Sequence, residues 1–197
     1  MLLRIIVIAS ILCVVLESCG KGGTGPEDKT PAQLVSEGWQ AFLARNYQPA
    51  VGLFGEAISK DANYVDAYNG AGWSNAKLNS LSAAINNFAL GYARDPNNLE
   101  IKAGLSFVYN ADKDYDQSIV LAKDVVQANP NWVFSRSPSI DVSDLRLLLA
   151  ENYFAIAEFD SSYDQVYMLD STFTADVSTI AGQTLLAQRI EKLERNG

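Results

Sequence analysis

Histidine is absent from this chain of 197 residues, and cysteine is scarce, with two residues. The lack of histidine excludes Ser-His and Cys-His nucleophile pairs, imidazole acid–base catalysis and histidine metal ligation. We therefore predict a non-enzymatic protein with no catalytic residues, no metal site and no cofactor, with carboxylate, lysine or tyrosine chemistry as the remaining enzymatic alternative. Basic residues number 15 against 23 acids, for a net charge of -8. Such a chain repels phosphate backbones, so we expect no nucleic acid partner.

The N-terminus, MLLRIIVIASILCVVLESCG, holds one cation followed by an apolar run. The run from Ile5 to Leu16 is too short to span a bilayer comfortably and has the layout of a secretory signal. It ends in the residues LESC, which resemble the lipobox of bacterial lipoproteins. That resemblance implies a signal peptide over residues 1–18 and an acyl anchor on Cys19. An ordinary secretory signal with Cys19 as a free thiol is the alternative, but a lone cysteine at the start of a secreted chain favours acylation.

Residues 19–30, CGKGGTGPEDKT, are glycine-rich and polar, without hydrophobic periodicity. This composition predicts a flexible tether between the anchor and the folded domain. In lipoproteins of the enteric type, a residue other than Asp after the acylated cysteine directs the chain to the outer membrane. Gly20 stands there, so the resemblance implies an envelope protein anchored in the outer membrane and facing the periplasm.

Beyond the tether, the sequence repeats with a period of 34 residues in units that begin at Pro31, Val65 and Leu99. Each unit has a small residue at its eighth position, and aromatic, small and proline residues recur in later columns. The repeated columns are Gly38, Gly72 and Ser106; Tyr47, Leu81 and Tyr115; Ala50, Ala84 and Ser118; Phe54, Phe88 and Ala122; and Ala62, Pro96 and Pro130. This pattern predicts pairs of helices that stack along the chain.

The columns resemble those of the tetratricopeptide repeat. The resemblance implies an all-α fold, a right-handed superhelix of about four helix-turn-helix units with a C-terminal capping helix. The domain spans 31–197, with repeats at 31–64, 65–98 and 99–132, an insertion at 133–142, a degenerate repeat at 143–172 and the capping helix at 173–195. The apolar face of that last helix would carry Val177, Ile180, Leu186, Ile190 and Leu193. Thr30-Pro31-Ala32-Gln33 predicts a capping box, and Asn98 a helix N-cap.

The eighth-position glycines would let two helices of one unit approach closely, despite a cost of roughly 1 kcal/mol in helix propensity. The next residue in each unit, Trp39, Trp73 or Phe107, would form an aromatic ladder on the concave face, which the first helices line in tetratricopeptide folds. Neighbouring columns add further groove positions by the same resemblance: Val35, Phe42, Asn69, Lys77, Ala103, Asn110, Leu147, Glu151 and Phe154. The alternative is that the rings pack between successive first helices as core.

Aromatic anchors beside a few amides and one cation suit a protein or peptide partner that buries an apolar side. We therefore predict a lipid-anchored adaptor that binds its partner through Trp39, Phe42, Asn69, Trp73, Lys77, Phe107 and Asn110, in an assembly or secretion complex of the envelope. In this interpretation the Trp73 ring is partly exposed to solvent. The alternative function is glycan capture on the exposed rings. The acidic run with Asp112, Asp114 and Asp116 at alternate positions lacks the glycine and glutamate of a calcium loop and predicts a solvated turn.

Overall fold

The computed structural model describes residues 28–196. The predicted signal peptide over residues 1–18, most of the tether and the anchor residue Cys19 lie outside this range. Nine α-helices form the described part of the chain, which contains no β-strand beyond one isolated bridge. None of these helices has the length and apolar character needed to cross a membrane.

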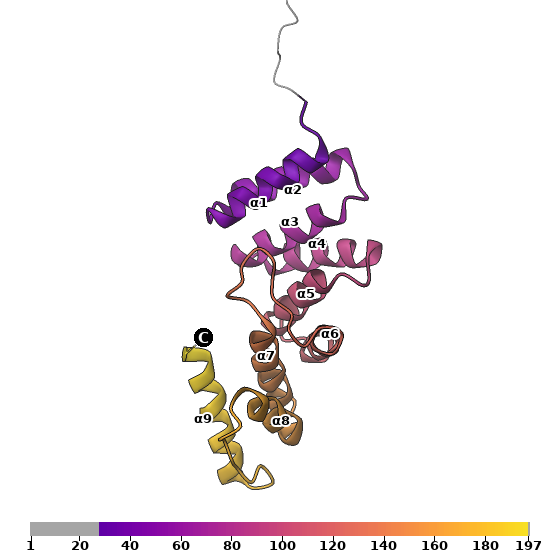
Figure 1. The fold of residues 1–197 in the computed structure, drawn as a ribbon. Coiled ribbons are helices and arrows are strands. Elements are labelled where there is room, and N and C mark those ends of the chain that lie inside the picture. The colour runs from indigo at the N-terminus through magenta and orange to yellow at the C-terminus, as the bar shows by residue number, and fades with distance from the viewer. Residues whose placement is uncertain (1–27, 197) are drawn as a thin grey trace, which may run out of the picture.

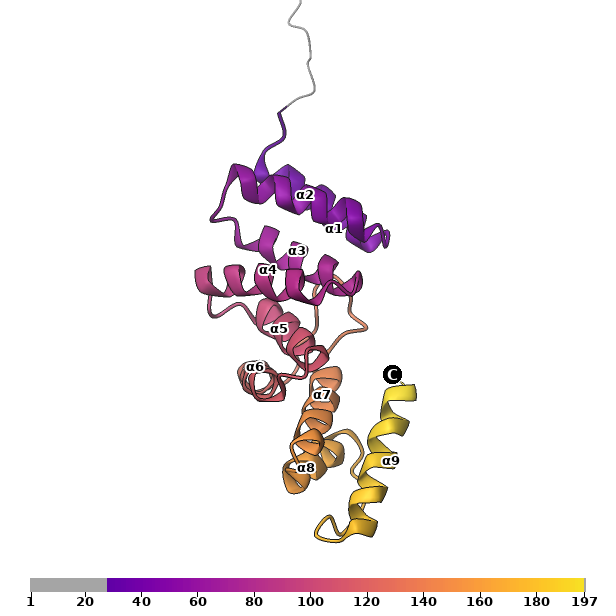
Figure 2. The same ribbon diagram turned by 180° about the vertical axis from the view of Figure 1, so that it is seen from behind.

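The helices follow one another as antiparallel pairs that stack into a superhelix (Figures 1 and 2). The first pair is α1 (Pro31–Leu43) and α2 (Tyr47–Lys60), and the second is α3 (Val65–Lys77) and α4 (Leu81–Arg94). The third is α5 (Leu99–Ala111) and α6 (Tyr115–Ala128), and the fourth is α7 (Val142–Ala155) and α8 (Phe159–Leu169). The first helices of the first three pairs begin 34 residues apart, which is the period of the sequence.

The helix ends follow from local chemistry. Thr30 and Gln33 form the predicted capping box at α1, and the Asn98 side chain accepts a hydrogen bond from Ile101 N at 3.1 Å to cap α5. Asp114 caps α6 in the same way through Gln117 N at 3.2 Å. The acidic run therefore serves the turn between α5 and α6, as predicted.

Two phenylalanines fill slots between glycines, and these slots explain the eighth-position pattern. A Cβ on Gly38 would lie 2.7 Å from the Phe54 ring, and one on Gly70, in the next unit, would lie 2.2 Å from the same ring. The Phe88 ring is enclosed in the same way by Gly72, at 2.5 Å, and by a glycine of α5. Each ring therefore joins its own repeat to the next one, and both rings are fully buried.

The third and fourth pairs replace this aromatic contact with a hydrogen bond. Ser118 Oγ donates to the carbonyl of Ser106 at 2.7 Å, and Ser162 Oγ donates to the carbonyl of Ala150 at the same distance. Both serines are fully buried. The small-residue columns therefore bring the helices together in all four pairs by two different contacts.

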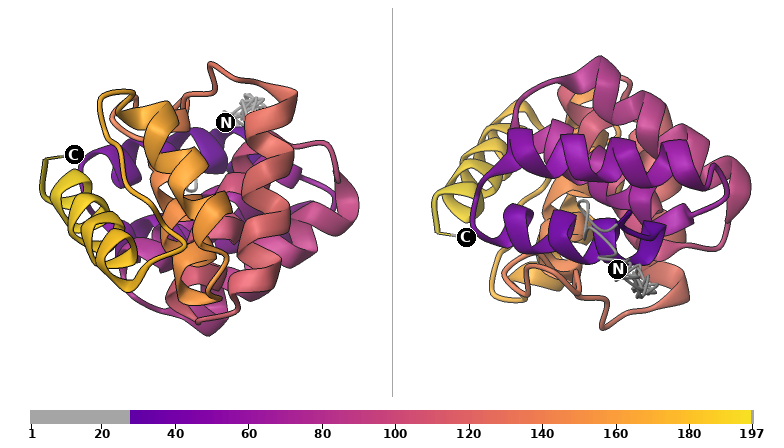
Figure 3. Two further views of the ribbon diagram at one scale, coloured as in Figure 1. Left: turned by 90° about the horizontal axis from the view of Figure 1, so that it is seen from below. Right: turned by 90° about the horizontal axis from the view of Figure 1, so that it is seen from above.

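A final helix, α9 (Ile180–Asn196), lies along one side of α7 and α8 (Figure 3). Leu186, Ile190 and Val177 bury their side chains in a second apolar cluster with α7 and α8. Ile180 was expected on this face, but it is 83% exposed, so that part of the prediction is wrong. The physical reason is the turn at Asp176–Thr179, which delays the helix start to Ile180 and directs its first turn into solvent.

Candidate functional site

The predicted groove is already occupied by the chain itself. Residues 133–141, between α6 and α7, leave the stack and rise along its concave side to the level of α3 and α4 (Figure 1). We call these residues the strap. A single antiparallel bridge joins its two ends at Val133 and Asp141, and Phe134 N donates to Ile140 O at 2.9 Å. Two turns, closed by hydrogen bonds from Ser137 N to Phe134 O and from Ile140 N to Ser137 O, complete a hairpin-like loop that lies against the first helices.

Phe134 inserts into the aromatic ladder. Its ring stacks on Trp73 at 4.3 Å between centroids and lies edge-on to Trp39 and Phe42 at 6.2 and 6.3 Å. The Phe134 side chain is fully buried, and only 3% of Trp39 and of Trp73 remains exposed. Phe42 is buried as well. The expectation that the Trp73 ring is partly exposed to solvent is wrong, because the strap covers the ring that α3 presents to the concave face.

Polar side chains of the groove hold the next residues of the strap. Ser135 N donates to Glu100 Oε1 at 3.1 Å, and Arg136 lies over the Trp39 ring with 4.8 Å between its Cζ and the ring centroid. The guanidinium also pairs with Asp66 at 3.6 Å. Three consecutive strap residues thus have separate contacts in the groove. The aromatic rings enclose Phe134, the Glu100 carboxylate accepts from the backbone amide of Ser135, and Asp66 and the Trp39 ring contact Arg136.

The groove carboxylates are positioned by further groove residues. Asp66 Oδ2 accepts a hydrogen bond from Trp39 Nε1 at 3.0 Å, and Glu100 Oε2 accepts one from Asn69 Nδ2 at 2.8 Å. Asn69 is buried, so the structure uses its amide to orient Glu100. Neither acid was singled out from the sequence. Their signal is their position in the first turns of α3 and α5, next to the ladder columns.

The contact between strap and groove leaves polar atoms without partners. Four buried side-chain atoms of the described residues make no hydrogen bond to the protein, and three belong here: Asn69 Oδ1, Trp73 Nε1 and Arg136 Nε. The fourth, Arg189 Nε, lies on α9. Buried polar groups are nearly always paired in folded proteins, so this concentration marks the strap contact as imperfectly satisfied.

Asn110 contributes to the core of the superhelix. Its Nδ2 donates to Asn152 Oδ1 at 2.7 Å, and Asn152 Nδ2 donates to Ser118 Oγ at 2.7 Å. Ser118 in turn donates to the Ser106 carbonyl. The network joins α5, α6 and α7, and Asn110 is half-buried within it.

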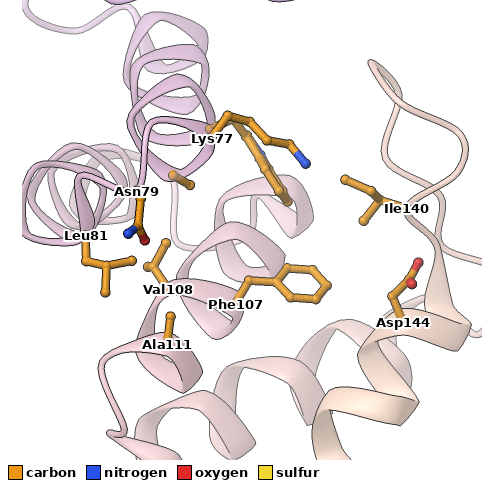
Figure 4. A pocket seen from close by; sticks show the side chains of 10 residues that line it. Lys77, Asn79, Leu81, Phe107, Val108, Ala111, Ile140 and Asp144 are labelled. Carbon is orange, nitrogen blue, oxygen red and sulfur yellow. The ribbon is translucent and has the colours of Figure 1, made fainter. Parts of the chain in front are cut away.

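One part of the concave face stays open beside the strap. A pocket of about 310 Å³ lies between α3, α5 and the strap (Figure 4). Trp73 and Phe107 form the aromatic wall of the pocket, and Ile140 lines the side formed by the strap. Lys77 lies on one rim, and Asp144, at the start of α7, lies on the other. Of the predicted partner-binding residues, the structure brings Trp73, Lys77 and Phe107 together around this opening.

The fourth repeat has a different cover. Glu151 and Phe154, which were expected to line the groove, face α9, where they border a small pocket with Ile190 and Glu194. Burial, a hydrogen bond to Glu194 and repulsion from its charge raise the pKa of Glu151 to about 8. Glu151 is therefore mainly protonated in the folded protein at neutral pH.

No protein-family model and no curated protein matches the sequence. Several solved structures of MamA match the fold. The structure of a MamA mutant is 20% identical, with a TM-score of 0.63 over 84% of this chain and 88% of that one. A MamA structure from Desulfovibrio magneticus RS-1 is 15% identical, with a TM-score of 0.60 over 86% and 78% of the two chains. The fold is of the tetratricopeptide type. At these identities the similarity concerns the fold.

Proposed function

We propose that this protein is a non-enzymatic, lipid-anchored adaptor of the bacterial envelope that holds a protein partner on its concave face. The open pocket bordered by Trp73, Phe107 and Ile140 carries the proposal. Its walls are largely apolar, and Lys77 and Asp144 offer one charge of each sign at its rim. A large apolar side chain of a partner fits such an opening, with polar neighbours pairing at the rim.

The covered ladder does not support glycan capture. Stacking on a sugar needs an accessible ring face, and Phe134 occupies the face of Trp73. Trp39 is enclosed by Phe42, Phe54, Phe134 and the Arg136 guanidinium. Phe107 is the ladder ring that is only half-buried, and it suits an apolar side chain better than a polar ring.

Site-specific photo-crosslinking tests the proposal. A benzoylphenylalanine at Lys77, on the pocket rim, should give a discrete protein adduct in cells. The same group at Val120, which is 57% exposed on α6, serves as the control on a second helix. Adding Phe107→Asp should abolish the adduct at Lys77 by placing a charge in the apolar wall. An adduct that is equal at both positions, or that survives Phe107→Asp, would contradict the proposal.

The anchor has its own test. With Cys19→Ala, the protein should leave the membrane fraction or accumulate as uncleaved precursor, because acylation needs the thiol. Metabolic labelling with an alkyne fatty acid followed by fractionation measures this directly. Unchanged labelling and unchanged membrane association of the variant would remove the lipid anchor from the proposal.

A further inference from the structure

The strap sits in the groove in the manner of a bound peptide. It is a hairpin-like loop with two turns, and its anchoring residues Phe134, Ser135 and Arg136 contact first helices of the first three repeats. These are the helices that line the concave face. The aromatic slot encloses the Phe134 ring, and Glu100 accepts a hydrogen bond from the Ser135 amide. Asp66 and Trp39 contact the Arg136 guanidinium.

The helical stack does not depend on the strap for its continuity. The helix α6 packs directly on α7, and α5 also contacts α7, so the third and fourth repeats meet without it. In repeat proteins each unit is stabilised mainly by its direct neighbours. Lifting the strap therefore removes a cover and exposes the ladder, while the order of the helices is preserved.

The strap also leaves hydrogen-bonding capacity unused. Trp73 Nε1 is a buried donor without an acceptor, and Asn69 Oδ1 is a buried acceptor without a donor. A different segment that offers an acceptor and a donor at these points would form bonds that the strap does not. The groove is thus complementary to peptide segments like the strap, and a segment that also pairs with these two atoms would bind more tightly than the strap does.

We propose that the strap is a resident ligand, and that the partner displaces it with a segment of its own that carries an aromatic residue two positions before an arginine. This inference rests on the proposed function of the concave face. Arginine is favoured over lysine because its planar guanidinium both stacks on Trp39 and pairs with Asp66. The open pocket gives the partner its first contact, since Trp73 and Ile140 border both the pocket and the strap contact. A side chain seated there lies next to the segment that must leave.

The covalent attachment of the strap favours the strap over a free partner in the competition for the groove. A segment joined to its own groove by short connections has an effective concentration in the millimolar range, so the groove is closed at rest. A free peptide of the same sequence should bind only when the strap is weakened. This difference makes the inference measurable without a known partner.

The test uses the full chain with Phe134→Ser and Arg136→Ser together, and a labelled peptide of residues 133–141, VFSRSPSID. We expect saturable binding to the double variant by fluorescence anisotropy and at least tenfold weaker binding to the parent chain. The matched control peptide, in which the phenylalanine is alanine and the arginine is serine, should not bind. Equal affinity for both chains, or no binding to a variant that retains its helical spectrum, would overturn the inference.

Hydrogen exchange of the unchanged protein covers the case in which the double variant fails to fold. The amides of Phe134 and Val142, which bond to Ile140 O and Trp132 O, should exchange at least tenfold faster than the central amides of α3 and α5. Exchange at the rate of global unfolding would show that the strap is core, and the inference would fall. If the crosslink from Lys77 persists in that case, the proposed function stands without it.

Discussion

The two apolar clusters of this protein are covered in different ways. The first, formed by α1 to α7, is completed on the concave side by Phe134 of the irregular strap, and the second, on α7 and α8, is closed by the helix α9. A helix satisfies its own backbone, so α9 adds side chains to the cluster at little polar cost. The strap forms turns of its own, but three buried polar atoms of the strap and of the first helices beside it remain without a partner. The comparison supports the inference that α9 is a permanent part of the core and that the strap can be displaced.

The largest expected effect comes from the ring under the strap. Trp73→Ala removes a side chain that is 3% exposed, and we expect it to lower the free energy of unfolding by about 3 to 5 kcal/mol. Denaturant titration followed by circular dichroism measures the loss. A decrease below about 1 kcal/mol, typical of an exposed site, would show that the strap does not cover the ring in solution. Phe107→Ala, at the half-buried ladder position, is the matched control and should cost less.

The cover made by α9 should be nearly as costly to weaken. Leu186 is fully buried, so Leu186→Ala should lower the free energy of unfolding by about 2 to 4 kcal/mol. Leu185→Ala, on the exposed side of the same helix, is the control and should have an effect within about 0.5 kcal/mol. Limited proteolysis of α9 should accelerate in the Leu186 variant alone. If both variants are equally stable, α9 is not a permanent cover and the comparison fails.

The glycine slots lie beneath the strap and should respond independently of it. Gly72→Leu places a side chain where a Cβ alone would lie 2.5 Å from the Phe88 ring, and we expect a loss of about 2 kcal/mol despite better helix propensity. Gly52→Leu is the control, because its Cβ would meet nothing within 4 Å. That variant should be neutral or slightly more stable. A thermal midpoint of the Gly72 variant at or above that of the parent would contradict the slot.

The smallest effect concerns pH and tests the second cover. The pKa of Glu151 is raised to about 8 in the folded state from 4.5, so between these values only the folded state holds the proton. Its contribution to stability is therefore fully present below pH 4.5 and is lost as pH rises towards 8. Glu151→Gln should match the parent at low pH and exceed it at pH 8.5 by about 1 to 2 kcal/mol, after discounting for the partial exposure of the pair. Glu191→Gln controls for net charge, and equal gains in both variants would contradict the raised pKa of Glu151.

The repeating part of the fold could be predicted from the sequence because it depends on local spacing. Gly38 and Gly72 predicted close helix approach, and the Phe54 and Phe88 slots confirm it. The positions of the rings on the first helices were also predictable. Their cover was not, because Phe134 lies 61 residues after Trp73 and belongs to a loop without periodicity.

The strap did carry a signal that could have been read. VFSRSPSIDV is the only insertion in a regular array of repeats, and it holds a phenylalanine and an arginine beside polar residues. An aromatic residue and a cation match the aromatic and acidic residues of the first helices. These residue types indicate what the loop could contact. The spacing of the repeat columns does not predict where a loop between repeats will lie, so the contact itself could not be predicted from the sequence. The same limit applies to Ile180, whose exposure depends on a turn rather than on periodicity.

The glycine slots also constrain how this chain can change over time. Because one ring touches glycines in two consecutive units, Gly38, Phe54 and Gly70 form a group whose members cannot be replaced independently. A larger residue at either glycine is tolerated only after the ring has become smaller, so accepted changes must come in a particular order. The serine contacts of the third and fourth repeats use a backbone carbonyl as acceptor, and a carbonyl is present whatever residue supplies it. Sequence drift should therefore be slow in the N-terminal half of the superhelix and faster towards the C-terminal half.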